Sequence, residues 1–269
     1  MPYSFPKKSL GQHFLVDQTV VDRLLHCLQP RTGDHLVEIG PGRCALTKPL
    51  LQHLRELSAI QFDVIEFDRD LIEPLIVLQK TNPFFKVHEA DALDFDFSVL
   101  KKDTHLLRIV GNLPYNISTP LLFHLLQWAD SIQDMLFMLQ KEVVDRLVAP
   151  PDSEHYGRLS VMMQYHSAAT RLFDVPPAAF NPPPKVMSSV VYIKPHVVLP
   201  VVANDYRHFF ELVKLAFNQR RKTLRNSLKT MVNDDDWAKL AISPQCRAEN
   251  LSVADFVKMS NHYVHLCDR

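Results

Sequence analysis

A glycine-rich turn is the first place in this sequence where residue types and spacing point to a ligand. Gly40 and Gly42 follow an apolar run and precede a segment with helical spacing. Because glycine has no Cβ, such a turn lets the backbone approach a ligand closely. Glu66 comes 66 − 40 = 26 residues after Gly40, at the end of the next apolar run, where an acidic side chain can hold ribose hydroxyls. The pattern predicts a nucleotide-like ligand.

The residues around the turn help to choose between two kinds of ligand. Gly40 to Ala45 also fits the dinucleotide fingerprint G-x-G-x-x-A, so a nicotinamide oxidoreductase has to be considered. However, Pro41 removes one backbone N–H from the loop that would receive a pyrophosphate, and Glu38 adds an acidic group beside it. A cationic cofactor without phosphates fits better, and S-adenosylmethionine has this character.

A third acidic residue extends the pattern. Asp91 follows another apolar run, and its carboxylate can accept a hydrogen bond from an adenine amine. Taken alone, Glu66 and Asp91 would be interpreted as solvated loop acids. Ligands of open α/β sheets bind at the carboxyl ends of strands, which is where all of these residues are expected. We therefore predict that the glycine turn, Glu66 and Asp91 bind the cofactor together.

The composition bounds the class of protein without naming its partner. The chain has 269 residues, is 46% hydrophobic and has a formal net charge of +0, with a pI near 7.2. This is enough for one substantial core and a smaller second one. A nucleic-acid partner would have to be contacted through local charge clusters. Widely spaced cysteines, no secretory leader and no membrane-length apolar run lead us to expect free thiols, a cytoplasmic location and no membrane contact. We also expect a monomer.

The residues with ligand chemistry need a sheet to bring them together. Apolar runs of β type alternate with segments of helical spacing over the first two-thirds of the chain. We expect strands at residues 35–39, 62–67, 85–88, 106–110 and 135–139. Uniformly apolar strands separated by helices are typical of a parallel sheet that is covered on both faces. The predicted fold is therefore a doubly wound α/β domain.

The last third of the chain has a different pattern. Two more strands are expected at 170–175 and 190–194, separated by a proline-rich stretch and placed as an antiparallel edge of the sheet. From residue 205 onward the spacing predicts helices at 206–217, 219–231, 237–240 and 253–266. We expect a mostly parallel α/β domain over residues 1–200 and a small all-helical domain over residues 201–269.

Asn112-Leu113-Pro114-Tyr115 ends the fourth expected strand, and here the chain resembles the N6-adenine amino methyltransferases. The lone pair of an adenine amine is delocalised into the ring, so the amine is a poor nucleophile. The resemblance implies that the Asn112 side-chain oxygen and the Pro114 carbonyl accept the two amine hydrogens, which turns the lone pair toward the methyl donor. Tyr115 would stack on the extruded base.

The resemblance narrows to one family and covers nearly the whole chain. The segments that carry it are 8–15, 37–42, 112–120, 140–143, 180–186 and 216–225. Together they look like the bacterial small-subunit rRNA adenine dimethyltransferases. That family implies a Rossmann-like, S-adenosylmethionine-dependent methyltransferase domain followed by a small helical domain. It also implies N6 dimethylation of two adjacent adenosines in the 3′-terminal hairpin loop of 16S rRNA.

The resemblance also implies roles for single residues. His13, Leu15 and Asn112 would contact the cofactor, and Phe180 would face Tyr115 across the target base. The family usually has Asn where this chain has His13, so a contact through that amide is not carried over, whereas a backbone contact is. Phe180 fits equally well as a ring packed on the core.

A basic run near the C-terminus suggests an RNA contact. It contains Arg220, Arg221, Lys222 and Arg225, with no acidic residue inside it to pair with. Such a run is usually a solvated helix face, but unpaired cations also contact nucleic-acid phosphates. We predict that it binds the phosphate backbone of 16S rRNA in the small ribosomal subunit. No group of side chains has metal-ligand spacing, so no metal is predicted.

Other functions remain open from the sequence. A nicotinamide oxidoreductase would leave the Asn112 to Tyr115 motif without a role. An RNA-binding factor for small-subunit assembly is compatible with methyl transfer. The large-subunit rRNA methyltransferases that confer macrolide resistance share the N-terminal and Asn-x-Pro-Tyr elements, but the run at 217–225 favours the small-subunit family.

Overall fold

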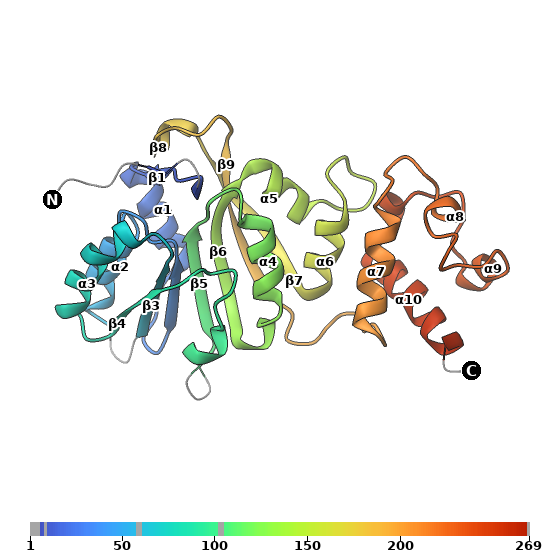
Figure 1. The fold of residues 1–269 in the computed structure, drawn as a ribbon, viewed down its shortest axis with the longest axis horizontal. Coiled ribbons are helices and arrows are strands. Elements are labelled where there is room, and N and C mark those ends of the chain that lie inside the picture. The colour runs from blue at the N-terminus through green and yellow to red at the C-terminus, as the bar shows by residue number, and fades with distance from the viewer. Residues whose placement is uncertain (1–5, 8–9, 58–60, 102–104, 268–269) are drawn as a thin grey trace. The chain divides into compact units, whose positions relative to one another are not determined.

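A seven-stranded sheet forms the centre of the N-terminal part of the protein (Figure 1). The computed structural model describes residues 6–7, 10–57, 61–101 and 105–267. The strand order is β4-β3-β2-β5-β6-β9-β7. The strands are β2 (His35–Ile39), β3 (Gln61–Glu66), β4 (Phe85–Glu89), β5 (Leu107–Asn112), β6 (Ile132–Gln140), β7 (Ser167–Val175) and β9 (Ser188–Pro195). Strands β4, β3, β2, β5 and β6 are parallel and β9 is antiparallel to β6. The predicted sheet with an antiparallel edge is confirmed.

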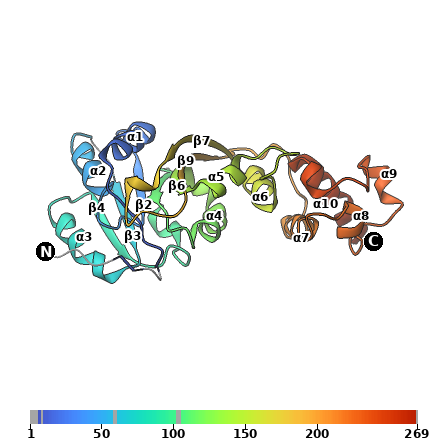
Figure 2. The same cartoon turned by 90° about the horizontal axis from the view of Figure 1, so that it is seen from above.

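Helices cover both faces of this sheet (Figure 2). The helices α1 (Gln18–Leu28), α2 (Thr47–Leu54) and α3 (Ile72–Lys80) share one buried cluster with alternate strand residues such as Leu36, Phe62 and Val110. Helix α4 (Ser118–Leu126) lies on the other side. Because both faces are covered, the strands are apolar throughout, which explains why their positions could be predicted from apolar runs alone.

The parallel register places the ligand-facing residues at one end of the sheet. Glu38 in β2 is level with Val64 in β3 and Val110 in β5, so β2, β3 and β5 end side by side. A separate two-stranded ribbon joins β1 (Phe14–Leu15) to β8 (Phe180–Asn181) in antiparallel fashion. This ribbon ties the N-terminal segment to the loop before β9.

The chain divides into two compact units. The described residues of 1–144 and 170–195 form the first, and those of 145–169 and 196–269 form the second. The second unit is mostly helical, and residues 145–169, which the sequence pattern assigned to the first domain, group with it.

The remaining α-helices are α5 (Lys141–Val148), α6 (Arg158–His166), α7 (Tyr206–Ala216), α8 (Leu224–Ser227), α9 (Asp236–Leu240) and α10 (Val253–Cys267). Short 3₁₀ helices are η2 (Arg69–Leu71), η3 (Phe97–Leu100), η4 (Ala129–Ser131), η5 (Pro177–Ala179) and η6 (Ala248–Asn250).

The expected helix over residues 219–231 is wrong. The chain turns sharply after α7, and α8 is only one turn long. Thr223 forms an antiparallel bridge with Arg247, and the Leu224 N–H donates to the Cys246 carbonyl at 2.8 Å. These bonds to a distant segment take the backbone groups that a continuous helix would use.

In the part of the chain that the structure describes, no helix is long and apolar enough to cross a membrane.

Candidate active site

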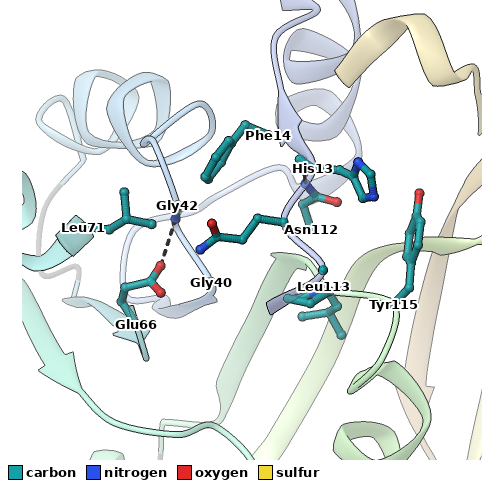
Figure 3. Close-up of a pocket in the computed structure, with 12 residues that line it drawn as sticks. His13, Phe14, Gly40, Gly42, Glu66, Leu71, Asn112, Leu113 and Tyr115 are labelled. Carbon is teal, nitrogen blue, oxygen red and sulfur yellow. Dashed lines mark hydrogen bonds between the residues drawn. The ribbon is translucent and has the colours of Figure 1, made fainter. Parts of the chain in front are cut away.

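The glycine turn after β2 has the backbone conformation that its sequence predicts. Gly40 and Gly42 have φ angles of +68° and +55°, which residues that carry a Cβ rarely adopt. A Cβ on Gly42 would also lie 3.2 Å from the Phe14 ring. The Gly42 N–H donates to Glu66 Oε2 at 3.1 Å, so the turn and the end of β3 are joined (Figure 3).

Glu66 is a buried carboxylate with two backbone donors. Its Oε1 accepts from the Asp68 N–H at 2.8 Å, and its side chain faces the space beside the glycine turn (Figure 3). Burial raises the pKa of Glu66, and the hydrogen bonds from the Asp68 and Gly42 N–H groups oppose that rise. Each carboxylate oxygen has a second lone pair, so Glu66 retains the capacity to accept from a ligand hydroxyl.

Two neighbouring cavities open at the carboxyl ends of the strands. The larger, of about 240 Å³, is lined by Ile39, Glu66, Asp91 and Ile117 among others, and has mostly apolar walls. The smaller, of about 70 Å³, is lined by residues that include His13, Asn112 and Tyr115. The lining residues common to both are Gln12, Gly40, Glu66 and Pro114. Asp91 Oδ1 accepts from the Leu93 N–H at 2.9 Å, which orients that carboxylate.

A third and smaller cavity, of about 40 Å³, lies behind the turn. Its lining includes Leu15, Glu38, Gly42 and Asn112. Glu38 is buried, and its Oε2 accepts from the Thr47 hydroxyl at 2.8 Å. Burial raises the pKa of Glu38 to about 8, so the carboxyl is mostly protonated at pH 7 in the free chain. A cation bound nearby would favour its ionised form.

Asn112 at the end of β5 is oriented by the N-terminal segment. Its Nδ2 donates to the His13 backbone carbonyl at 3.0 Å, so Oδ1 is the atom that remains to accept a hydrogen bond. The His13 ring binds the Pro182 carbonyl through Nδ1 at 2.8 Å. Because a carbonyl only accepts, this Nδ1 carries a proton. The His13 carbonyl holds Asn112, and a backbone contact of His13 with the cofactor stays a prediction.

Pro114 and Tyr115 lie in the turn between β5 and α4. The Pro114 carbonyl already accepts from the Ile117 N–H at 3.2 Å and the Ser118 hydroxyl at 2.9 Å. Both of its lone pairs are engaged, which the sequence did not reveal. The Tyr115 hydroxyl is 2.7 Å from Ser188 Oγ, and this hydrogen bond limits the orientation of the ring. Burial raises the pKa of Tyr115, so the phenol is neutral at pH 7.

The Phe180 ring is buried in this structure, and its expected position facing Tyr115 across the target base stays a prediction. Its side chain is only 3% exposed and belongs to the buried core. The reason is the register of the β1–β8 ribbon, which pairs Phe180 with Leu15, a member of the same core cluster. The ring beside Tyr115 is His13, at a centroid distance of 5.6 Å (Figure 3).

Several residues at the site were missed from the sequence. Gln12 and Phe14 line the smaller cavity, and Asp68 and Ser188 hold lining residues in place. Gln12 and Phe14 belong to segment 8–15, which carries part of the family resemblance, so that segment was the available signal. Its first two residues, 8 and 9, lie outside the described residues. Asp68 follows Glu66 closely but carries no motif signal of its own.

The basic run is only partly free of acidic partners. Arg220 pairs with Glu249 at 3.2 Å, and Arg225 pairs with Asp234 at 2.5 Å. No acidic residue lies inside the run, but residues outside it supply partners for Arg220 and Arg225, so the inference that these two cations are unpaired is wrong. Arg221 and Lys222 are exposed, and neither forms an ion pair with the residues that the structure describes.

The arrangement combines a cavity with an amide oxygen and an aromatic ring at its edge. Carboxylates and glycine backbone line the cavity, and Asn112 and Tyr115 lie beside it. Among the described residues, no cluster of three or more His, Cys, Asp or Glu side chains is arranged to hold a metal ion. Binding without a metal stays a prediction.

Solved structures of low sequence identity share this fold. A dimethyladenosine transferase from Plasmodium falciparum superposes with a TM-score of 0.77 at 23% identity, covering 94% of this chain and 98% of that one. The 23S rRNA methyltransferase ErmE superposes with a TM-score of 0.70 at 19% identity, covering 93% of this chain and 99% of that one. These likenesses confirm the Rossmann-like methyltransferase fold.

Sequence comparisons identify the family. Ribosomal RNA small subunit methyltransferase A of Alcanivorax borkumensis is 52% identical over 255 residues, which are 95% of this chain and 89% of that protein. The protein of the same name from Laribacter hongkongensis is 51% identical over 263 residues, 98% of each chain. The family model described as ribosomal RNA adenine dimethylase matches residues 5–265. The chain therefore belongs to the ribosomal RNA adenine dimethylase family of enzymes.

Proposed function

We propose that this enzyme uses S-adenosylmethionine to dimethylate the N6 amines of two adjacent adenosines in the 3′-terminal hairpin loop of 16S rRNA. The proposal includes a role in maturation of the small ribosomal subunit, and a monomer acting in the cytoplasm. The observation that carries it is the position of Asn112 and Pro114, which line the smaller cavity together with Glu66 and Gly40. Pro114, Glu66 and Gly40 also line the larger cavity. A group that could hold an amine thus adjoins a site suited to a nucleoside.

The larger cavity fits the adenosine part of S-adenosylmethionine. Its apolar walls, Ile39, Ile65 and Ile117 among them, suit a base, and Asp91 has a carboxylate oxygen available for the base's amine. Glu66 would accept from ribose hydroxyls. Pro41 leaves the turn short of one N–H, which matters little for a ligand without phosphates. When bound, S-adenosylmethionine supplies an electrophilic methyl group.

Asn112 would act on the amine of the target adenine. Its Nδ2 is held by the His13 carbonyl, so Oδ1 is directed to accept an amine hydrogen. That hydrogen bond strengthens as the nitrogen becomes tetrahedral, and an acceptor placed in advance stabilises that state. Pro114 contributes as second acceptor if the Ser118 hydroxyl turns away from its carbonyl, which requires only rotation about one side-chain bond.

Tyr115 would provide the stacking surface for the flipped adenine. Its hydrogen bond to Ser188 limits ring rotation, so the face is already oriented before RNA binds. Base stacking on an aromatic ring is worth about 1–3 kcal/mol. Phe180 would contact the opposite face of the base only after its ring, which is buried in this structure, turns out of the core. Arg221 and Lys222 would contact phosphates, which supply affinity rather than base selection.

Transfer of labelled methyl groups to unmodified small subunits tests the proposal. We expect incorporation from labelled S-adenosylmethionine at the two adjacent adenosines, located by mapping of the modified bases. Labelling of large-subunit RNA, or at another position of 16S rRNA, would overturn the assignment of the substrate. An Asn112→Ala variant that fails to methylate but still supports subunit maturation would separate the assembly role from the chemistry.

A further inference from the structure

The N-terminal segment forms one wall of the cavities at the proposed active site. Leu10 and Gln12 line the larger cavity, and Gly11, His13 and others line the smaller one. We call residues 10–14 the N-terminal wall. The opposite side consists of residues from the strand ends, Glu66 among them. Whatever holds this wall in place therefore also determines the shape of both cavities.

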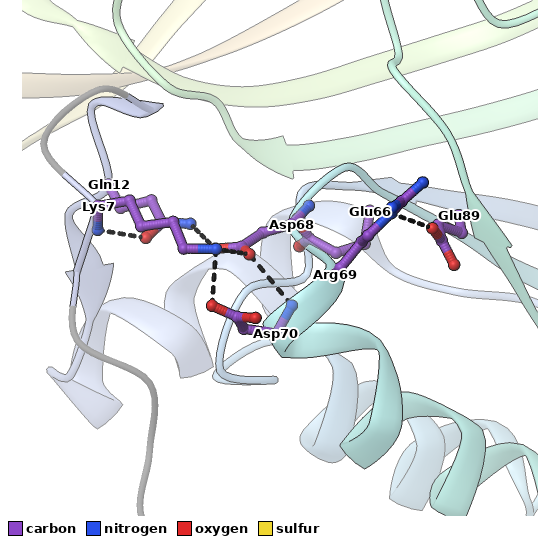
Figure 4. A network of polar contacts seen from close by, with 7 residues as sticks. All are labelled: Lys7, Gln12, Glu66, Asp68, Arg69, Asp70 and Glu89. Atoms are coloured by element: carbon purple, nitrogen blue, oxygen red, sulfur yellow. Dashed lines mark hydrogen bonds and ion pairs between the residues drawn. The ribbon is translucent and has the colours of Figure 1, made fainter.

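A buried carboxylate, Asp68, holds the wall. Its side chain is 1% exposed, and its Oδ2 accepts from Gln12 Nε2 at 2.8 Å (Figure 4). Its Oδ1 pairs with Lys7 Nζ at 2.5 Å, and Lys7 also pairs with Asp70 at 2.7 Å. The Lys7 N–H donates to Gln12 Oε1 at 2.8 Å, which joins the two residues that contact Asp68.

The same residue supports the carboxylate on the other side of the cavity. The Asp68 N–H donates to Glu66 Oε1, and Glu66 in turn accepts from Gly42. Asp68 thus joins the N-terminal wall to the acidic residue and the glycine turn. Burial opposes ionisation of Asp68, yet the hydrogen bonds from Lys7 and Gln12 outweigh it and lower the pKa of the carboxyl. Asp68 is charged at neutral pH and its negative charge has partners.

We propose that Asp68 is a positioning residue that keeps the N-terminal wall closed against Glu66, so that release of the cofactor requires its contacts with Lys7 and Gln12 to break. This inference rests on the proposed function, because it takes S-adenosylmethionine as the occupant of the larger cavity. Asp68 lines neither cavity and acts through Gln12 and Glu66.

The geometry predicts which variants open the wall. Lys7 and Gln12 bond to different oxygens of Asp68, and Asp68→Asn replaces one of these oxygens by an NH2 donor, so one of the two contacts is lost in this geometry. Lys7→Met removes only the cation, and Lys7→Arg retains it. Arg69→Ala is the matched control: Arg69 lies in the same turn and pairs with Glu89 at 2.8 Å, but it is 86% exposed and points away from the wall (Figure 4).

Cofactor dissociation measures the effect most directly. The protein is loaded with labelled S-adenosylmethionine and chased with an excess of unlabelled cofactor. We expect the cofactor to dissociate about tenfold to a hundredfold faster from Asp68→Asn than from the unmodified protein, and also faster from Lys7→Met. Lys7→Arg and Arg69→Ala should release it at the rate of the unmodified protein. Steady-state assays should show a higher KM for the cofactor and an unchanged kcat, a division that simple loss of stability would not produce.

Two further readouts keep the proposal falsifiable if Asp68→Asn folds poorly. Rising salt should speed release from the unmodified protein more than from Lys7→Met, because Lys7 is 39% exposed and its ion pairs are partly screened. Amide hydrogen exchange at residues 10–14 should accelerate in Lys7→Met and not in Arg69→Ala. Release and exchange equal to those of the unmodified protein in Lys7→Met would overturn the role of this contact network. Failure of the unmodified protein to bind the cofactor would instead overturn the proposed function, and this inference with it.

Discussion

Charged residues at the two ends of the parallel strands are used in opposite ways. Near the amino ends, Arg108 donates to Asp134 at 3.0 Å, to Asp34 at 2.6 Å and to the Leu28 carbonyl at 2.7 Å. These bonds tie the end of α1 to the sheet. At the carboxyl ends, Glu66 and other polar groups line cavities and keep acceptor capacity. Charges that are satisfied within the chain stabilise the fold, and those that are not are available to a ligand.

Cavity size alone does not identify the functional end. A hollow of about 450 Å³ lies at the amino ends and is lined by residues that include Arg108, Asp134 and Tyr192. It is larger than either cavity at the carboxyl ends. Two of its charged lining residues, Arg108 and Asp134, are paired with each other, and the Tyr192 hydroxyl donates to Asp134 at 3.2 Å. We therefore assign this hollow a structural role and predict different mutational effects at the two ends.

The largest effect is expected from Arg108→Ala. The variant leaves Asp34 and Asp134 without their buried cation, and breaking a buried ion pair typically costs about 3–5 kcal/mol. Denaturant unfolding should show that loss, whereas methyl transfer per folded molecule should stay close to that of the unmodified protein. Unchanged stability would mean that the amino-end charges are not what holds α1 to the sheet.

Asn112→Ala should have the opposite effect: methyl transfer should be slowed and stability retained. Loss of a preorganised acceptor should slow methyl transfer about 10²–10³-fold, or roughly 2.7–4 kcal/mol of barrier, with little change in RNA affinity or stability. Tyr115→Ala should weaken RNA binding as well as rate, and Tyr115→Phe should retain much of the activity despite losing the bond to Ser188. Single-turnover assays at saturating cofactor separate these cases. A normal rate in Asn112→Ala would reduce the motif to a structural turn.

Glu66→Ala should weaken cofactor binding by about 1.5–3 kcal/mol, because charge-assisted hydrogen bonds to ribose hydroxyls are lost. Calorimetry with S-adenosylmethionine measures this difference directly. Thermal unfolding serves as the control, since Glu66 also accepts from two backbone N–H groups. An affinity equal to that of the unmodified protein would remove Glu66 from the site.

Asp63 gives a pH test of a second satisfied cluster. The carboxylate is fully buried and accepts from His35 at 2.7 Å and His88 at 2.6 Å. Burial opposes ionisation, but these bonds and one from Gln61 hold the pKa of Asp63 well below its usual range. Its contribution to stability is therefore complete above the unfolded pKa of about 3.9 and declines as pH falls toward the lower folded pKa.

Denaturant unfolding at a series of pH values below 4 measures that contribution. The unmodified protein should lose up to about 1.4 kcal/mol per pH unit through this one group, and Asp63→Asn should lack that part of the slope. Equal slopes would show that Asp63 titrates alike in the folded and unfolded chains.

The smallest effect is expected in the basic run, where paired and unpaired cations lie side by side. Changing Arg221 and Lys222 to Ala should lower RNA affinity and make its salt dependence shallower by up to roughly one unit per lost phosphate contact. Arg225→Ala is the matched control, because Asp234 already pairs with Arg225. Equal losses in both variants would mean that pairing within the chain does not decide which cations bind RNA.

Residues close together in the sequence account for what could be predicted. The strands were found because a sheet covered on both faces needs apolar runs, and the turn was found because φ angles of +68° and +55° favour glycine. Parallel strands end at one edge, so the sequence was sufficient to predict that Glu66 and Asn112 lie near one another.

Only the tertiary structure decided which polar groups are already in use. From the sequence, Phe180 fitted both a core position and a position at the site, and the register of the β1–β8 ribbon buries its ring in the core of this structure. The hydrogen bond from Ser118 to Pro114, and the ion pair in which Arg220 donates to Glu249, determine how freely Pro114 and Arg220 can contact a ligand. The Glu249 contact and the bridge that replaces the expected helix at 219–231 join residues far apart along the chain. Residue type sets what a group can bind, but only folding determines which partners reach it first.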